Sequence, residues 1–224
     1  MQPYFFPYIG YFQLISAVDQ FVLYDDVNFI KGGWINRNFI LGPDGPQRIT
    51  LQLSGASSNK LINEVGIGGN QHKILKSIRQ TYSKAPYFSS VFPLIESCMH
   101  INENNLCALL CGSIKAVCDY LDIQSDIKLS SDIEKDSKQK GAKKVIDICK
   151  KLHADCYINS IGGKALYDRK EFSDNGLRLY FIATGEVSYK QYAGSFLPNL
   201  SIIDAMMFNS KKQMAELLKV FDLV

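Results

Sequence analysis

The chain has 224 residues, of which 46% are hydrophobic and 21% charged, and both fractions are close to those of ordinary globular proteins. This composition excludes a disordered protein, and a chain of this length can bury enough surface to fold without disulfide or metal cross-links. No run of about 18 apolar residues occurs, and the first residues do not have the pattern of a secretory signal. We therefore expect a cytoplasmic protein without an integral membrane segment.

The net charge of +3 is too small to indicate a nucleic-acid-binding protein. The lysine-rich stretch at residues 138–151 is typical of the solvated face of a helix. Six cysteines include no CxxC pair and three histidines form no HxH or HExxH motif, so no metal site is predicted. Cys107, Cys111 and Cys118 recur at helical spacing among apolar residues, which predicts reduced thiols in the core.

The first third of the chain predicts short helical and extended segments in alternation. The expected elements are a helical turn at residues 14–17 and strands at residues 20–24, 38–41, 47–53 and 63–67. The first strand ends at Asp25 and Asp26, as is typical of a buried strand that leads to a functional edge. The sequence Gly-Pro-Asp-Gly-Pro at residues 42–46 predicts a hairpin turn between the next two strands.

The middle of the chain is predicted to be helical, and the last third returns to an α/β pattern. The expected helices cover residues 71–82, 86–99, 105–121, 140–152, 201–208 and 211–221, and the expected strands cover residues 155–159 and 176–183. Pro93 is expected to kink or split the helix that contains it.

The succession of strand, glycine loop, helix and strand in the last third favours a partly parallel sheet. We therefore predict an α/β fold with a partly parallel, Rossmann-like sheet and a helical middle segment. The predicted organisation is a single domain over residues 1–224, with α/β parts at about 1–70 and 153–224 and a helical insertion at about 71–152.

Residues 2–12 (QPYFFPYIGYF) interleave aromatic side chains with two prolines, which predicts a rigid loop rather than a helix or strand. One interpretation is a hydrophobic corner that attaches this segment to the core. The other is a platform on which a sugar or base stacks, with phenol hydroxyls to orient it. Composition favours neither interpretation over the other.

Residues 25–38 (DDVNFIKGGWINRN) form a second cluster, with two carboxylates, a lysine, an arginine, side-chain amides and the single tryptophan. Acidic residues at the carboxyl end of a strand lie where open α/β sheets bind ligands. An arginine offers a bidentate fork for phosphate, and asparagines bind hydroxyls. We interpret this segment as functional, and the alternative is a polar loop whose charges pair with one another.

A third cluster comprises Asn159, Gly162, Gly163 and Tyr167. A glycine pair between a strand and a helix permits close approach of the backbone to a phosphate or sugar. The segment lacks the complete GxGxxG spacing, and a simple tight turn explains it equally well. Ser201 and Asp204 fit the pattern of a helix N-cap and are interpreted as structural.

Six segments together resemble the WbqC-like family, in the same order and along the whole chain. They are residues 2–12 (QPYFFPYIGYF), 24–29 (YDDVNF), 34–38 (WINRN), 85–88 (APYF), 157–163 (YINSIGG) and 196–204 (FLPNLSIID). Members of this family are encoded in gene clusters for O-antigen, a part of lipopolysaccharide, and for other surface polysaccharides. The resemblance therefore implies a role in making or decorating sugars, although it carries over no catalytic residue.

The chain departs from the family pattern at its first residue. Members usually have a short apolar strand before the Gln-Pro motif, often with a histidine just before the glutamine. Met1 stands in that place here, and we expect the strand to be absent. Either the start of the sequence is truncated or this subgroup does without the histidine, so the resemblance does not establish a mechanism that uses it.

We favour an enzyme that acylates or aminoacylates a nucleotide-linked amino-sugar, as a transferase or amide ligase. Its partners would be the nucleotide-activated sugar and an acyl or amino-acid donor; the sequence identifies neither a cofactor nor an oligomeric state. The alternative is a non-catalytic sugar-nucleotide-binding or scaffold subunit of the assembly pathway. The absence of a complete catalytic constellation favours this alternative.

In the enzyme hypothesis, Asp25 or Asp26 acts as general base or binds a hydroxyl, and Lys31 and Arg37 hold phosphate. The predicted catalytic residues are Asp25, Asp26 and Lys31. The predicted substrate-binding residues are Gln2, Tyr4, Tyr8, Tyr11, Trp34, Asn36, Arg37, Asn159, Gly162, Gly163 and Tyr167. Loops that leave neighbouring parallel strands emerge on one side, so the aromatic loop and residues 25–37 are expected to line a shared cleft.

Overall fold

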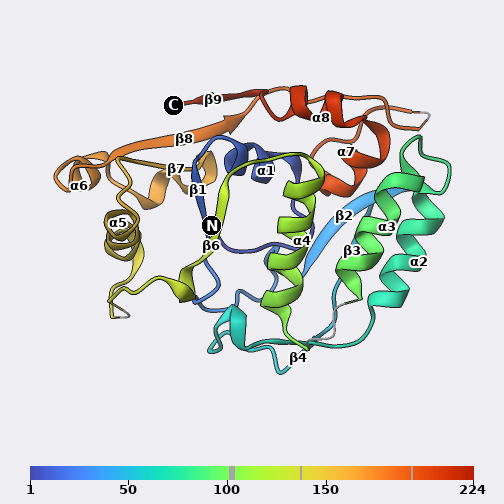
Figure 1. Ribbon diagram of the computed structural model, residues 1–224. Helices are drawn as coiled ribbons and strands as arrows, with labels where there is room; N and C mark the ends of the chain where they lie inside the picture. The colour runs from blue at the N-terminus through green and yellow to red at the C-terminus, as the bar shows by residue number, and fades with distance from the viewer. Residues whose placement is uncertain (101–103, 137, 193) are drawn as a thin grey trace.

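The β-structure of the protein consists of short strands that pair in small groups (Figure 1). The computed structural model describes residues 1–100, 104–136, 138–192 and 194–224. Its strands are β1 (Gln20–Leu23), β2 (Arg37–Gly42), β3 (Gly45–Thr50), β4 (Leu53–Ser54), β5 (Gly66–Ile67), β6 (Asp126–Leu129), β7 (Cys156–Ser160), β8 (Arg178–Thr184) and β9 (Phe221–Leu223).

Parallel pairing of strands confirms the predicted α/β class. β1 pairs in parallel with β6, and β7 pairs in parallel with β8, where Tyr157 lies opposite Leu179. β9 extends the second group by pairing antiparallel with β8. The predicted hairpin is also confirmed, since β2 and β3 pair antiparallel from Arg37 opposite Thr50 to the turn at Gly42 and Gly45.

The backbone of Met1 is hydrogen-bonded to β1, although the described residues before β1 form no strand. Its nitrogen donates to the Val22 carbonyl oxygen at 2.6 Å, and its own carbonyl accepts from the Tyr24 amide at 2.8 Å. Two such bonds, to residues on either side of one partner, are the pattern of a parallel ladder. Met1 is therefore aligned in parallel beside the end of β1.

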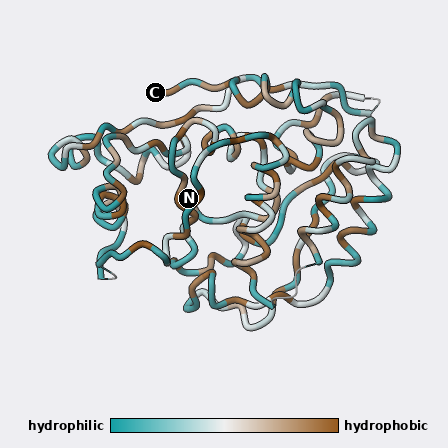
Figure 2. The backbone as a smooth tube through the Cα atoms, viewed as in Figure 1, coloured by the Kyte–Doolittle hydropathy of each residue, from teal (hydrophilic) through white to brown (hydrophobic). Residues whose placement is uncertain are grey.

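The helices confirm the segments predicted at residues 71–82, 86–99, 105–121, 140–152 and 201–208. They are α1 (Ile9–Ser16), α2 (Gln71–Tyr82), α3 (Phe88–Met99), α4 (Leu106–Tyr120), α5 (Gly141–Lys151), α6 (Arg169–Ser173), α7 (Ile202–Phe208) and α8 (Lys211–Leu217), with 3-10 turns η1 (Ile62–Glu64), η2 (Ser130–Asp132) and η3 (Ile161–Leu166). α2 and α3 alternate hydrophobic and hydrophilic residues along their turns (Figure 2). Pro93 lies within α3 without splitting it. The prediction of a rigid loop over residues 2–12 is wrong at its end, because residues 9–12 begin helix α1 and are buried in the core.

The predicted helical middle segment contains a strand that the sequence analysis missed. β6 lies between α4 and α5 and pairs with β1, so residues far apart in the chain share one parallel ladder. It has only four residues, all partly or fully exposed, and so lacks the continuous apolar run expected of a buried strand.

Buried apolar side chains form two clusters in the described part of the chain. The larger cluster joins α1 and β1 to α2, α3, α4 and α7. The smaller one lies between α5, α6 and the β7–β8 pair, and includes Val145, Cys149, Phe172 and Phe181. In Figure 1, α5 and α6 lie at the end of the molecule opposite α2 and α3.

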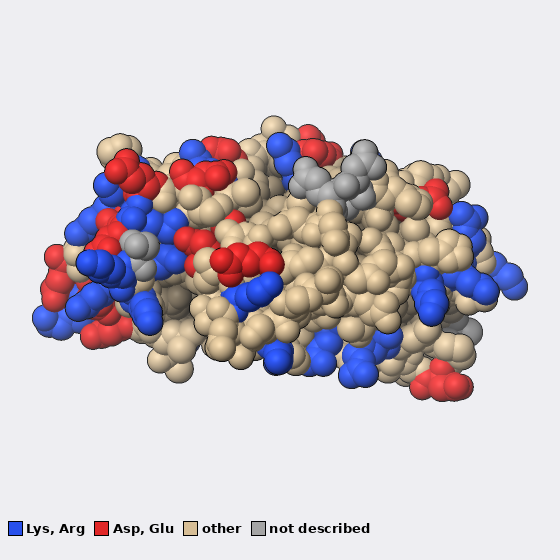
Figure 3. Space-filling model, turned by 90° about the horizontal axis from the view of Figure 1, so that it is seen from below, with Lys and Arg blue, Asp and Glu red and all other residues tan. Residues whose placement is uncertain are grey.

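Lysine and arginine side chains gather at the end of the molecule that carries α5 (Figure 3). Lys138, Lys140, Lys143, Lys150 and Lys151 are exposed, which confirms the prediction of a solvated basic helix face. Lys144 is the exception in this stretch, because it is buried.

Candidate functional site

The aromatic loop, residues 2–12, serves both of the roles that the sequence left open. Phe5, Phe6 and Phe12 are almost fully buried in the larger core cluster. Tyr4 and Tyr8 are only half-buried, and both rings line a pocket described below. The loop is therefore attached to the core by its phenylalanines and presents its first two tyrosines to the pocket.

Tyr11, a predicted substrate-binding residue, belongs to the buried side of this loop. Its ring is 1% exposed, and its hydroxyl donates to the carbonyl oxygen of Gln2 at 2.9 Å. The contact that involves Gln2 is thus made by its backbone. For both residues a role in binding stays a prediction.

Two polar side chains from distant segments hold the loop at Phe6. The Asn38 amide on β2 donates to the carbonyl oxygens of Phe5 (3.2 Å) and Phe6 (2.6 Å), and the Ser201 hydroxyl donates to Phe6 O at 2.7 Å. Phe6 has a φ of 40°, a left-handed conformation that is unfavourable for a residue with a bulky side chain. These buried hydrogen bonds compensate for that strain.

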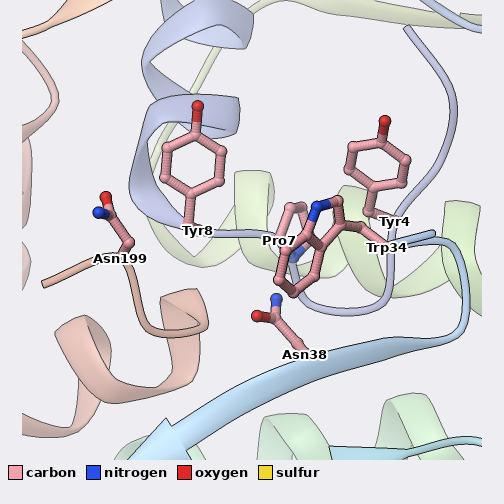
Figure 4. A pocket seen from close by; sticks show the side chains of 6 residues that line it. All are labelled: Tyr4, Pro7, Tyr8, Trp34, Asn38 and Asn199. Carbon is pink, nitrogen blue, oxygen red and sulfur yellow. The ribbon is translucent and has the colours of Figure 1, made fainter. Parts of the chain in front are cut away.

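The aromatic pocket has a volume of about 340 Å³ and is lined by Tyr4, Pro7, Tyr8, Trp34, Asn38 and Asn199. In Figure 4 the rings of Tyr4 and Tyr8 rise from the N-terminal segment with their hydroxyls on the same side, and the Trp34 indole lies between them in this view. Trp34 is 51% exposed, so this side of the pocket is accessible to solvent. The volume lies within the usual range of small-molecule pockets, about 300–1,000 Å³.

The hydroxyls of Tyr4 and Tyr8 are polar groups of the pocket that can both donate and accept hydrogen bonds. Burial raises the pKa of Tyr4, and it also raises the pKa of Tyr8, although the Thr184 hydroxyl partly offsets this effect. Both phenols are therefore protonated at neutral pH and can donate and accept hydrogen bonds. The Asn38 amide is already used by the aromatic loop, since both of its contacts to Phe5 and Phe6 are internal.

Gly10 allows Tyr8 to take its place in the pocket. A methyl group at Gly10 would overlap the Tyr8 ring and the Thr184 hydroxyl. Tyr8 is also the residue that precedes α1, so the start of this helix and the wall of the pocket are set by the same residue.

The segment that supplies Asn199 is held by a buried network around Asp204. The Asp204 carboxylate accepts hydrogen bonds from the Tyr82 hydroxyl (2.8 Å), the Tyr189 hydroxyl (2.7 Å) and the Gln191 amide (2.7 Å). Burial nevertheless raises the pKa of Asp204 above its usual value, against the effect of these three donors. Gln191 also bonds both backbone groups of Leu197, which fixes the chain just before Asn199.

Asp25, one of the predicted catalytic residues, has its carboxylate oxygens engaged within the protein. The side chain is 1% exposed and accepts hydrogen bonds from the Asn63 amide (3.2 Å) and the Ser131 backbone nitrogen (3.0 Å). These contacts connect the end of β1 to η1 and η2. Its catalytic role stays a prediction, without a geometric argument in its favour.

Asp26 lies in a cluster of charges that is separate from the residues lining the pocket. Its Oδ2 atom is 2.9 Å from Lys135 Nζ and 3.2 Å from Lys144 Nζ, and all three side chains are largely buried. Burial raises the pKa of Asp26, but the nearby Lys135, Ser130 and Lys144 outweigh it, so the pKa lies below its usual value. Lys144 also lies over the Tyr24 ring, 4.7 Å from its centre.

This ion cluster was not recognised in the sequence. Asp26 was predicted to have a functional role, but its partners lie more than a hundred residues further along the chain. Lys144 was grouped with the solvated lysines of its helix, and Lys135 belongs to a polar loop. The apolar positions of α5 are the signal that could have identified Lys144, because it shares the buried face with Val145 and Ile148.

The remaining predicted residues of the second cluster lie on or near β2. The Asn36 amide donates to the Leu51 carbonyl oxygen at 2.8 Å, and this bond holds the strand. Lys31 is exposed, and Arg37 is half-buried with its guanidinium beside Gly32. Their roles in catalysis and phosphate binding stay predictions.

The third predicted cluster lies at the end of β7, next to the smaller core. Asn159 packs on Gly163, whose Cβ position would be only 2.6 Å from the Asn159 amide nitrogen, so a larger residue would not fit there. Gly162 is exposed, and Tyr167 is half-buried with its ring against Tyr157 at 5.7 Å. The structure brings this cluster together but leaves its role in phosphate or sugar binding a prediction.

Three lining residues were missed as site residues, namely Pro7, Asn38 and Asn199. Pro7 and Asn38 are adjacent in the chain to the predicted residues Tyr8 and Arg37, whereas Asn199 lies in a segment that was interpreted as structural. In the described part of the chain, no group of three or more His, Cys, Asp or Glu side chains is arranged to hold a metal ion. Within the same residues, no helix has the length and apolarity needed to cross a bilayer.

Comparison with known proteins agrees with the resemblance stated above. Residues 2–216 match the WbqC-like protein family. The chain is 30% identical over 215 residues to the uncharacterized protein Rv1507c of Mycobacterium tuberculosis, an alignment that covers 93% of this chain and 91% of that protein. No solved structure matches the chain. The protein whose aromatic loop and Trp34 form this pocket is therefore a member of the WbqC-like protein family.

Proposed function

We propose that this protein binds a nucleotide-linked amino-sugar in the aromatic pocket, as a cytoplasmic component of O-antigen or other surface-polysaccharide biosynthesis. The single observation that carries the proposal is the placement of Tyr4, Tyr8 and Trp34 around one cavity of about 340 Å³. Sugar rings present C–H faces that pack on aromatic rings, while phenol hydroxyls bind sugar hydroxyls. The family resemblance supports the pathway.

The reaction that we propose is the transfer of an acyl or aminoacyl group to the amino-sugar. The new bond joins the acyl carbon to the sugar nitrogen, the donor's leaving group departs, and the amine loses a proton. Tyr8 is the pocket residue best placed to relay that proton, since the Thr184 hydroxyl is its neighbour. The donor is a thioester, whose thiol leaves, or an aminoacyl adenylate formed from an amino acid and ATP with release of diphosphate, whose AMP leaves; neither route needs an oxidant or reductant.

A second candidate is a binding subunit without turnover. The composition of the pocket favours this candidate, because no carboxylate, histidine, cysteine or lysine is among the residues that line it. Asp26, the predicted base, is instead engaged by two lysines. A subunit of this kind would present the sugar nucleotide to another enzyme of the pathway.

Mass spectrometry of UDP-, dTDP- and GDP-linked amino-sugars separates these candidates. Each sugar is incubated with the protein, ATP and either an acyl-coenzyme A or a mixture of amino acids. A mass increase equal to one acyl or aminoacyl group, lost in Tyr8→Phe, supports the transferase. Binding without a mass change supports the subunit. Failure of every amino-sugar nucleotide to bind overturns the proposal.

A further inference from the structure

The β2–β3 hairpin turns a basic and aromatic face toward solvent. In an antiparallel pair, residues directly opposite one another point to the same side. Phe39 lies opposite Arg48, and Arg37 lies opposite Thr50, so these four side chains share one face. The other face carries Asn38 and Ile49, which are buried. We call the first surface the hairpin face.

The two arginines of the hairpin face are neighbours. Arg37 and Arg48 occupy diagonal positions of the ladder, which are typically about 7–8 Å apart. The Arg37 guanidinium also lies beside Gly32, and so adjacent in the chain to the exposed Lys31. Arg37 and Arg48 therefore share one side of the hairpin, and Lys31 lies next in the chain to the glycine that Arg37 approaches.

The charge of this face is not neutralised within the protein. Between residues 27 and 63 Asp44 is the single acidic residue, and it lies in the turn at the far end of the hairpin. Among the residues that the structure describes, Lys31, Arg37 and Arg48 form no ion pair. A ligand with two or more negative charges is the complement of such a surface.

Trp34 links the hairpin face to the aromatic pocket, which Asn38 lines from the other face of the hairpin. The indole packs edge-to-face on Phe39, with the ring centres 6.0 Å apart, and the same indole lines the pocket. Phe39 in turn lies opposite Arg48 in the ladder, so the indole connects the pocket to the strand positions that carry the arginines. A suitable anion is therefore one that is covalently linked to a group that binds in the aromatic pocket.

We propose that Arg37 and Arg48 bind the diphosphate of a nucleotide-linked sugar whose sugar ring occupies the aromatic pocket. The inference rests on the proposed function and adds to it a diphosphate subsite and a second arginine, Arg48. Each guanidinium can grip one phosphate through two parallel N–H···O bonds. Trp34 marks the boundary between the sugar and the diphosphate.

Calorimetric titration of single variants tests this assignment. The probes are UDP-, dTDP- and GDP-linked amino-sugars and, in parallel, the free amino-sugar. We expect Arg48→Ala and Arg37→Ala each to weaken binding of the nucleotide-linked sugar about tenfold and to leave that of the free sugar unchanged. Arg48→Lys should recover part of the loss, because a single ammonium cannot reproduce the planar fork.

The matched control is Arg178→Ala. Arg178 is also an exposed arginine on a strand, but it is already paired with Asp155 and is not a member of the hairpin face. Its removal should leave both affinities at the wild-type value. Melting temperatures of all variants show whether any loss reflects unfolding.

Two results would overturn the diphosphate subsite and leave the proposed function intact. One is equal affinity of Arg48→Ala and Arg178→Ala for the nucleotide-linked sugar, while Trp34→Ala still weakens it. The other is binding of anionic phospholipid vesicles that requires Arg48 while the sugar nucleotide does not. If wild-type protein binds no sugar nucleotide, the proposed function itself fails, and the subsite fails with it.

Discussion

The side-chain amide of Asn38 lies 2.6 Å from the carbonyl oxygen of Phe6 and ties strand β2 to the aromatic loop. The two segments carry the two walls of the pocket, Trp34 just before β2 and Tyr4 and Tyr8 on either side of Phe6. The hydrogen bond therefore determines the distance between these walls. A site that binds by stacking depends on this spacing.

Asn38→Ala removes this tie, and we expect it to lower both stability and sugar affinity. Two backbone carbonyls lose a buried donor, which should cost about 2 kcal/mol of unfolding free energy. Asn28→Ala is a matched control, because its amide donates to the Ser58 carbonyl in an exposed place and its loss should cost less than about 1 kcal/mol. Chemical denaturation of both variants measures the difference, and equal losses would contradict this role of Asn38.

Gly10→Ala should displace Tyr8 and close part of the pocket. The added methyl group overlaps the Tyr8 ring, so the ring has to move before the helix can form. Gly112→Ala is the helical control, since its Cβ position meets open space, and it should stabilise the protein by roughly 0.5–1 kcal/mol. If Gly10→Ala binds sugar nucleotide as wild type does, the position of Tyr8 is irrelevant to the pocket.

The ion cluster around Asp26 should make the free energy of unfolding depend on pH in the acidic range. Because the pKa of Asp26 is lowered on folding, its contribution is complete above the unfolded value of about 3.9 and is lost as the pH falls through the folded value. Asp26→Asn leaves two buried lysines unpaired and should cost about 3 kcal/mol at pH 7, or roughly 6–12 °C in melting temperature. The difference between wild type and variant should shrink below about pH 4.

Asp174→Asn is the control for this experiment, because Asp174 pairs with Lys170 where both side chains are exposed. Its loss should cost less than about 0.5 kcal/mol at any pH. Thermal melting from pH 3 to pH 8 compares the two variants. A destabilisation by Asp26→Asn that does not change with pH would contradict the ionic origin of the effect.

The cysteines should react slowly in the native protein. All six are free thiols, and burial disfavours the thiolate, which raises the pKa to about 11 for Cys149 and about 12 for Cys118. The contact with Cys107 and burial raise the pKa of Cys111 well above its usual value, so we expect the half-buried Cys156 to react first with a disulfide reagent at pH 8. Three or more fast-reacting thiols would show that Cys107 and Cys118 are not core residues.

The fold was largely predictable where periodicity is strong. The amphipathic helices α2 and α4 and the β2–β3 hairpin follow from apolar spacing and from a Gly-Pro-rich turn. β6 was not predictable, because its four residues pair with β1 from across the chain and do not form a continuous apolar run. Predicted helical residue Phe221 begins β9 instead, where pairing with β8 outweighs the local pattern.

The candidate site was predictable in its aromatic part and not in its charged part. Tyr4 and Tyr8 were identified by the density of aromatic side chains in residues 2–12, and Trp34 as the single tryptophan of a polar cluster; the structure places all three around one pocket. Sequence proximity wrongly suggested that Asp26 belongs with Trp34. Its carboxylate turns instead toward Lys135 and Lys144, which only tertiary structure brings near.

Tryptophan fluorescence is the most direct test of the central claim, because Trp34 is the single tryptophan of the chain and lines the pocket. The emission is followed while a nucleotide-linked amino-sugar is added to wild-type protein and to Tyr8→Ala. We predict a saturable change in emission for the wild type. For Tyr8→Ala we predict an affinity for the nucleotide-linked amino-sugar at least tenfold lower. A wild-type emission that stays constant up to millimolar UDP-, dTDP- and GDP-linked amino-sugars would contradict the account.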